Sequence, residues 1–114
     1  MKKIISFSVT VIFSLTIVCC KQDKAQVQPT VVDCASVTFS HDIAPIINAN
    51  CVSCHNSAYT CGPLTDYNDV KAKVDNGSLK QRVVITKDMS PTGTLSVADI
   101  QKIKCWIDNG AQNN

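Results

Sequence analysis

The sequence Cys51-Val52-Ser53-Cys54-His55 constrains what this chain can fold into more than any other feature. Cys-x-x-Cys-His is the pattern of covalent haem attachment, in which two cysteines add to the vinyl groups of one porphyrin. On a helical turn, residues 51 and 54 lie on the same face, so both thiols can reach that porphyrin. His55 follows at once and can bind the iron as an axial ligand. The sequence therefore predicts one covalent haem c held by Cys51, Cys54 and His55.

A Cys-x-x-Cys pair can also be a redox dithiol or half of a zinc site. The chain has no second Cys-x-x-Cys, and no thioredoxin-like βαβ pattern surrounds the motif. The adjacent His55, together with the export signal described below, favours haem. An exported dithiol or zinc module without haem is the alternative, and a pyridine haemochrome spectrum distinguishes the two.

The second axial ligand is either Met89 or His41. Met1 leaves with the signal peptide and His55 is already assigned, so no other Met or His is left. Met89 precedes Pro91 in a segment rich in turn residues, which suits a loop that presents a thioether, because Pro cannot extend a helix. We predict Met89 as the iron ligand. The alternatives are a Met that fills a gap in the core and ligation by two histidines.

The first twenty residues have the parts of a secretory signal. Lys2 and Lys3 precede an apolar run from Ile4 to Val18. This run is shorter than the roughly 20 apolar residues of a membrane span, so an uncleaved membrane anchor is the weaker interpretation. Its end resembles a bacterial lipoprotein box, which implies that Cys20 becomes the lipidated N-terminus. Cys19, which stands where the box usually has Gly, Ala or Ser, is the weaker candidate for the lipid acceptor.

The chain of 114 residues has room for one small domain behind this signal. We expect a signal peptide over residues 1–19, a lipidated N-terminus and flexible tether over residues 20–36, and the domain over residues 37–114. The location is then a bacterial cell envelope, where disulfides are permitted. Two of the 11 basic residues leave with the signal, and the remaining nine balance nine aspartates. Such a neutral chain cannot bind nucleic acid through counterion release.

The hydrophobic pattern predicts a small all-α domain of three to four short helices. The first helix is expected to start near His41, with Asp42 as its cap and Pro45 in its first turn. A second helix is expected over residues 66–75, and a short extended run over residues 79–85. The residues expected to face the core are Ile43, Ile46, Ile47, Tyr67, Val70, Val74, Ile100, Ile103, Trp106 and Ile107.

The last helix has the strongest boundary signals. Ser96 and Asp99 resemble a capping box, with Asp in place of Glu. Asn109 and Gly110 are typical of a helix end. We therefore expect a helix from about residue 97 to residue 108.

These features in this order resemble a class I cytochrome c, and more narrowly the short planctomycete-type bacterial cytochrome c domain. The resemblance covers about residues 37–112. Besides the haem motif it rests on Ile43-x-Pro45-Ile46, Leu64-x-x-Tyr67, Met89-Ser90-Pro91 and Trp106-Ile107-x-x-Gly110-Ala111. Ser90 replaces the first Pro of the family's usual Met-Pro-Pro, which implies a slightly looser loop. The resemblance implies an all-α fold with crossing terminal helices, one haem c and electron transfer.

Three further cysteines, Cys34, Cys61 and Cys105, can form at most one internal bridge. We expect Cys61–Cys105, which would tie the loop after the haem motif to the last helix. Cys34–Cys105 is the rival pairing, and buried free thiols are a third option. Closing a loop of tens of residues would contribute about 3–4 kcal/mol in the chain-entropy model.

Two axial side-chain ligands leave no iron position open for a substrate, so we expect a one-electron carrier with no catalytic residues rather than an enzyme. The lipid would confine the carrier to a membrane surface, so the expected partners are redox proteins, in particular membrane complexes. The alternative function is a haem module that binds or senses a small ligand when Met89 dissociates.

Overall fold

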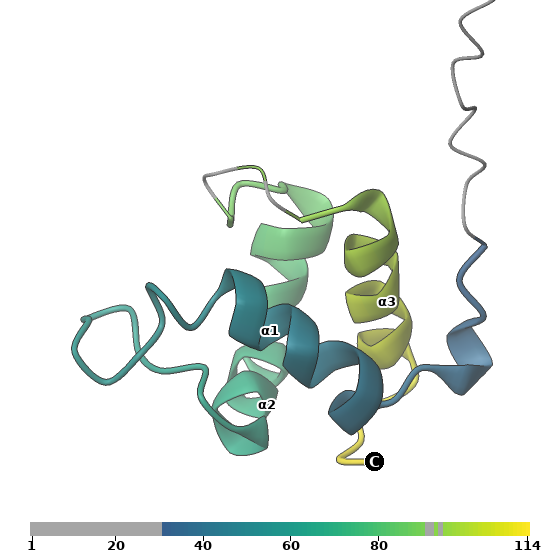
Figure 1. Ribbon diagram of the computed structural model, residues 1–114, viewed down its shortest axis with the longest axis horizontal. Coiled ribbons are helices and arrows are strands. Elements are labelled where there is room, and N and C mark those ends of the chain that lie inside the picture. The colour runs from purple at the N-terminus through teal and green to yellow at the C-terminus, as the bar shows by residue number, and fades with distance from the viewer. Residues whose placement is uncertain (1–30, 91–92, 94) are drawn as a thin grey trace, which may run out of the picture.

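The computed structural model describes residues 31–90, 93 and 95–114 (Figure 1). Within these residues the chain is helical and forms no strand, which confirms the all-α prediction. The elements are η1 (Cys34–Ser36), η2 (Phe39–Ile43), α1 (Ala44–Asn50), α2 (Tyr67–Asp75), η3 (Lys80–Ile85) and α3 (Val97–Asp108). No helix in this described part is both long and apolar enough to cross a membrane. The expected signal peptide and Cys20 lie outside the described residues.

The first helix consists of η2 and α1 and begins earlier than expected. Thr38 caps it, because its hydroxyl accepts the His41 N–H at 3.3 Å. The expected cap, Asp42, is therefore wrong, and its carboxylate instead accepts the Thr38 N–H at 3.1 Å. The earlier start brings Phe39 into the core, and burial of its ring favours the longer helix. Pro45 lies in the first turn of α1.

The expected bounds of α2 are confirmed. The Asp66 carboxylate accepts the Asp69 N–H at 3.0 Å and caps the helix. Val70 is buried, and Tyr67 packs against the core from the same face. Gly77, just beyond the helix, has a φ of +78°, a left-handed conformation that glycine adopts at little cost.

The extended run expected over residues 79–85 is wrong, because the chain forms the short π-type helix η3 there. Val83, Val84 and Ile85 favour a strand locally, but the described residues provide no partner strand. In helical form Leu79 and Val83 lie four residues apart on one face, and both are buried. Burial of this pair overrides the local preference.

The expected helix α3 is confirmed at both ends. The Ser96 hydroxyl accepts the Asp99 N–H at 3.0 Å, and the Asp99 carboxylate accepts the Ser96 N–H at 3.3 Å. This reciprocal capping box fixes the start of the helix. Ile103 and Trp106 are buried as expected, and Gly110 follows the helix with a φ of +92°.

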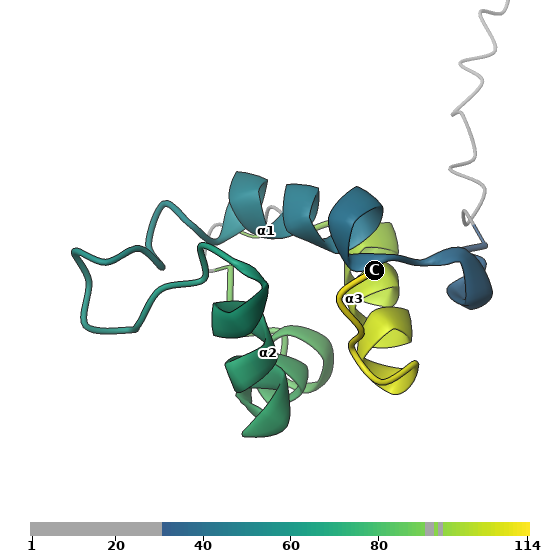
Figure 2. The same cartoon turned by 90° about the horizontal axis from the view of Figure 1, so that it is seen from below.

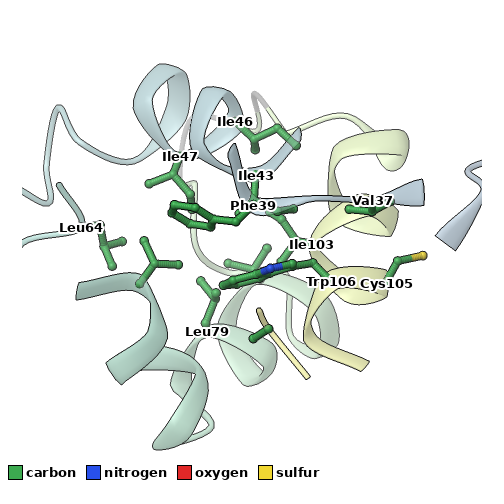
Figure 3. Close-up of a cluster of buried hydrophobic side chains, with 13 residues drawn as sticks. Val37, Phe39, Ile43, Ile46, Ile47, Leu64, Leu79, Ile103, Cys105 and Trp106 are labelled. Atoms are coloured by element: carbon green, nitrogen blue, oxygen red, sulfur yellow. The ribbon is translucent and has the colours of Figure 1, made fainter. Parts of the chain in front are cut away.

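One cluster of buried apolar side chains joins the helices (Figure 3). Within it the centroid of the Trp106 ring lies 5.4 Å from that of Phe39 and 6.5 Å from that of Tyr67. The polar groups of Trp106 and Tyr67 are both hydrogen-bonded. Trp106 Nε1–H donates to the Gln112 carbonyl and the Tyr67 hydroxyl donates to the Ala111 carbonyl, each at 2.9 Å. These bonds fold the segment after α3 back onto the core.

The disulfide joins Cys34 to Cys105, 71 residues apart in sequence. The expected bridge between Cys61 and Cys105 is therefore wrong, and the rival pairing is present. The reason is long-range packing: η1 lies against α3, and the Asn109 side-chain amide donates to the Cys34 carbonyl at 2.7 Å. Cys61 is free and exposed. Residues 34–36, expected in the tether, are thus bonded to the domain.

Candidate functional site

The Cys-x-x-Cys-His motif forms a turn that continues from the end of α1. The Cys51 N–H donates to the Ile47 carbonyl at 2.8 Å, and the His55 N–H donates to the Cys51 carbonyl at 2.8 Å. The Cys54 N–H also donates to the Cys51 carbonyl, at 3.1 Å. The backbone therefore has the helical turn that the motif requires. Cys51 is half-buried against the core and Cys54 is exposed.

Burial raises the pKa of the Cys51 thiol. Loss of water around the side chain disfavours the thiolate relative to the neutral thiol. The two cysteines of the motif therefore have different surroundings, with Cys54 open to solvent.

A loop after the motif holds the imidazole of His55. In both views this loop, residues 51–64, projects beyond the end of α1 and away from α3 (Figures 1 and 2). It closes where the Leu64 N–H donates to the His55 carbonyl at 2.9 Å. His55 Nδ1 lies 3.1 Å from the Gly62 carbonyl oxygen. A carbonyl only accepts, so Nδ1 carries the hydrogen and Nε2 of the neutral ring keeps its lone pair.

His55 and Met89, the two predicted axial ligands, line the same cavity, whose volume is about 330 Å³. Much of its wall is apolar, and Lys73 and Arg82 are its charged lining residues. The other lining residues are Cys61, Leu64, Lys73, Ser78, Leu79, Arg82 and Val83. The fold thus brings together two residues from separate segments that the sequence singled out for the same role.

Arg82 holds the loop that presents Met89. Its carbonyl accepts the N–H groups of Asp88 and Met89 at 3.1 and 3.2 Å. Its guanidinium Nε donates to both carboxylate oxygens of Asp88, at 2.8 and 2.9 Å. This bond, with a second from the Thr86 hydroxyl, lowers the pKa of Asp88. Met89 is half-buried and packs against the core.

Of the other candidate residues that the structure describes, only Cys61 lines this cavity. Cys51 and Cys54 lie on the turn that leads to His55 and are not among the residues that line it. His41, the alternative ligand, is exposed in η2 and also lies outside the lining. Among the residues described, no three His, Cys, Asp or Glu side chains form a group that could hold a metal ion.

Sequence reasoning missed Gly62, which contacts His55, Arg82, which holds the loop of Met89, and Lys73, which lines the cavity. Only the positive φ of Gly62, +79°, follows a sequence signal, the Gly-Pro pair that marks a turn. The contacts of Lys73 and Arg82 depend on the folded chain. In comparisons with known proteins, no family model, no curated protein and no solved structure matches this chain.

Proposed function

We propose that the chain is a monohaem c-type cytochrome, with a class I cytochrome c-like fold, that transfers single electrons. The observation that carries the proposal is that the His of a Cys-x-x-Cys-His turn and the distant Met89 line one cavity with a largely apolar wall. The all-α fold agrees with it. N-terminal lipid on Cys20 would tether the carrier to a membrane of a bacterial envelope, with redox proteins, in particular membrane complexes, as partners.

The residues of the site fit a haem c in three respects. The turn of Cys51 and Cys54 offers two thiols for thioether bonds. The Gly62 carbonyl fixes the tautomer of His55 that leaves Nε2 as a metal ligand. Met89 offers a thioether to the same cavity. These residues would hold the group.

Bound there, the haem would supply an iron that changes by one electron between its ferric and ferrous states. His55 and Met89 would both hold the iron, so no position would remain for a substrate, which favours a carrier over an enzyme. Ligation by Met and His would give a higher reduction potential than ligation by two histidines. Leu64, Leu79 and Val83 line the cavity with hydrocarbon, which a porphyrin ring would contact.

The test is the absorption spectrum and mass of the protein made in a bacterium with haem c maturation. We expect a haemochrome spectrum with pyridine and a mass that includes one haem after denaturation. Cys51→Ala with Cys54→Ala should lose the covalent group. Cys61→Ser is the matched control, because Cys61 lines the cavity outside the motif, and it should keep the group. A colourless product with the mass of polypeptide plus lipid would refute the proposal.

One observation favours a second candidate function, a haem module that binds a small ligand. Lys87 and Ser90, on either side of Met89, have φ values of +54° and +72°. Such left-handed conformations cost non-glycine residues of order 1 kcal/mol each, so the loop that presents Met89 is strained, which favours a labile ligand. Carbon monoxide distinguishes the functions: fast stoichiometric binding by the reduced protein at neutral pH supports the binding module, and absence of binding supports the carrier.

A further inference from the structure

Lys73, on α2, differs from most lysines of the described residues in its partner. Its ammonium contacts the backbone carbonyl of Cys61 at 3.5 Å, the long end of a hydrogen bond. The Lys73 carbonyl accepts the Ser78 hydroxyl at 3.3 Å, and this bond ties the residues after α2 to the C-terminal end of that helix. By contrast, aspartates pair with Lys71, Lys80, Lys102 and Lys104. No Asp lies within ion-pair distance of Lys73 in the described part of the chain. Its charge therefore faces the loop after the motif.

The end of the Lys73 side chain also packs on Gly62. A Cβ built on Gly62 would lie 3.5 Å from Lys73 Nζ and 4.0 Å from Cε. At these distances a Cβ would be in ordinary van der Waals contact with the lysine, so what glycine supplies here is the positive φ of +79°. The same Gly62 accepts the His55 Nδ1–H at 3.1 Å. A continuous series of contacts thus runs from α2 through Cys61 and Gly62 to the imidazole.

We propose that Lys73 is a positioning residue for His55. It holds the Cys61–Gly62 peptide where the Gly62 carbonyl meets Nδ1. A hydrogen bond at Nδ1 fixes the orientation of the ring and raises the basicity of Nε2, the atom that would bind iron. The consequence for iron rests on the proposed function. The positioning of the loop by Lys73 does not depend on that function, because it follows from contacts within the polypeptide.

The loop needs such a hold because much of it has little packing of its own. Residues 57–61 are exposed, and Tyr59 is 57% exposed. The bonds of Leu64 and Gly62 to His55 close the loop at its end. Lys73 ties the loop to a regular helix, and a site on a regular element is positioned more tightly than one on a loop alone.

The experiment compares Lys73→Met, Lys73→Arg and Lys71→Met in the full mature protein by NMR. The readouts are solvent exchange of the His55 Nδ1 proton, exchange of the Leu64 amide, and the chemical shifts of the His55 ring. In Lys73→Met we expect both protons to exchange about two- to tenfold faster, the range for one ordinary hydrogen bond, and the ring signals to shift. Arg keeps the charge and the donors, so Lys73→Arg should restore the wild-type values.

Lys71→Met is the matched control, because Lys71 lies on the same helix but pairs with Asp75. It should leave all three readouts unchanged. Unchanged Nδ1 exchange and ring shifts in Lys73→Met would overturn the proposal, as would equal changes in Lys71→Met. If the wild type proves to carry no haem, the proposed function fails. The exchange rates of the same two protons would still decide whether Lys73 holds the loop.

Discussion

At the scale of single residues, the candidate site depends on the partners of His55 and Met89 as much as on these two side chains. The Gly62 carbonyl selects the imidazole nitrogen that stays available. Arg82 fixes the backbone of Met89 with its own carbonyl and fixes Asp88 with its guanidinium. Each predicted ligand is therefore held by a neighbour whose contact with it could not be read from the sequence.

Replacement of the predicted Met ligand tests the site at this scale. Met89→Ala should abolish the weak absorption band of the oxidised protein that reports sulfur–iron bonding. It should also lower the reduction potential, because the thioether favours the ferrous state. His41→Ala is the matched control, since His41 is exposed and outside the cavity, and its spectrum should match the wild type. An unchanged Met89→Ala spectrum would contradict the ligand assignment, and a changed His41→Ala spectrum would favour ligation by two histidines.

At the scale of helices, local signals account for the elements with clear ends, and long-range packing decides the others. The capping box at Ser96 and the cap at Asp66 could be predicted because each is a contact between residues near in sequence. The helical form of η3 could not, because burial of Leu79 and Val83 requires the rest of the core. The same holds for Lys73, whose contact with Cys61 joins two separate elements.

An ion pair between elements gives the fold a predictable response to acid. Lys102 on α3 donates to the Asp42 carboxylate in η2 at 2.8 Å, and the Asp42 side chain is 14% exposed. This bond, with the bond from Thr38, lowers the pKa of Asp42. A lowered carboxyl pKa contributes stability above the unfolded value, about 4, and this stability is lost as pH falls through the folded pKa.

Asp42→Asn should therefore lower the free energy of unfolding by about 1–2 kcal/mol at neutral pH. The difference from wild type should shrink as the pH falls from about 4, the unfolded value, through the lower folded pKa, where Asp42 becomes protonated. Urea unfolding of the variant and the wild type at pH 7 and at about pH 3 measures the difference at neutral pH and its decrease in acid. Asp108→Asn, in a more exposed cluster with Lys80 and Lys104, should cost less than about 1 kcal/mol. A loss of unfolding free energy in Asp42→Asn, relative to wild type, that grows as the pH falls would contradict this account.

At the scale of the whole molecule, the covalent link between Cys34 and Cys105 stabilises the small domain. In the chain-entropy model a closed loop of this length contributes about 4 kcal/mol, through restriction of the unfolded chain. The sequence showed that three cysteines allow one bridge, but the pairing depends on how η1 packs against α3. Spacing alone therefore could not choose between Cys34 and Cys61.

Cys34→Ser should lower the free energy of unfolding by about 2–4 kcal/mol, measured by urea denaturation of the oxidised protein. A reducing agent should lower the stability of the wild type by a similar amount. Cys61→Ser is the matched control and should leave stability unchanged, because Cys61 is free and exposed. The opposite pattern, a stable Cys34→Ser and a destabilised Cys61→Ser, would restore the bridge between Cys61 and Cys105.

The position of the bridge also decides how the molecule responds to force. A pull that arrives along the N-terminal segment passes from Cys34 directly into α3 at Cys105, which is 2% exposed and adjoins Trp106. Such a load acts on the packed helix α3 as a whole. It does not unwind η2 by breaking its hydrogen bonds one after another. A pull on the N-terminal segment would therefore load α3 before η2 and α1.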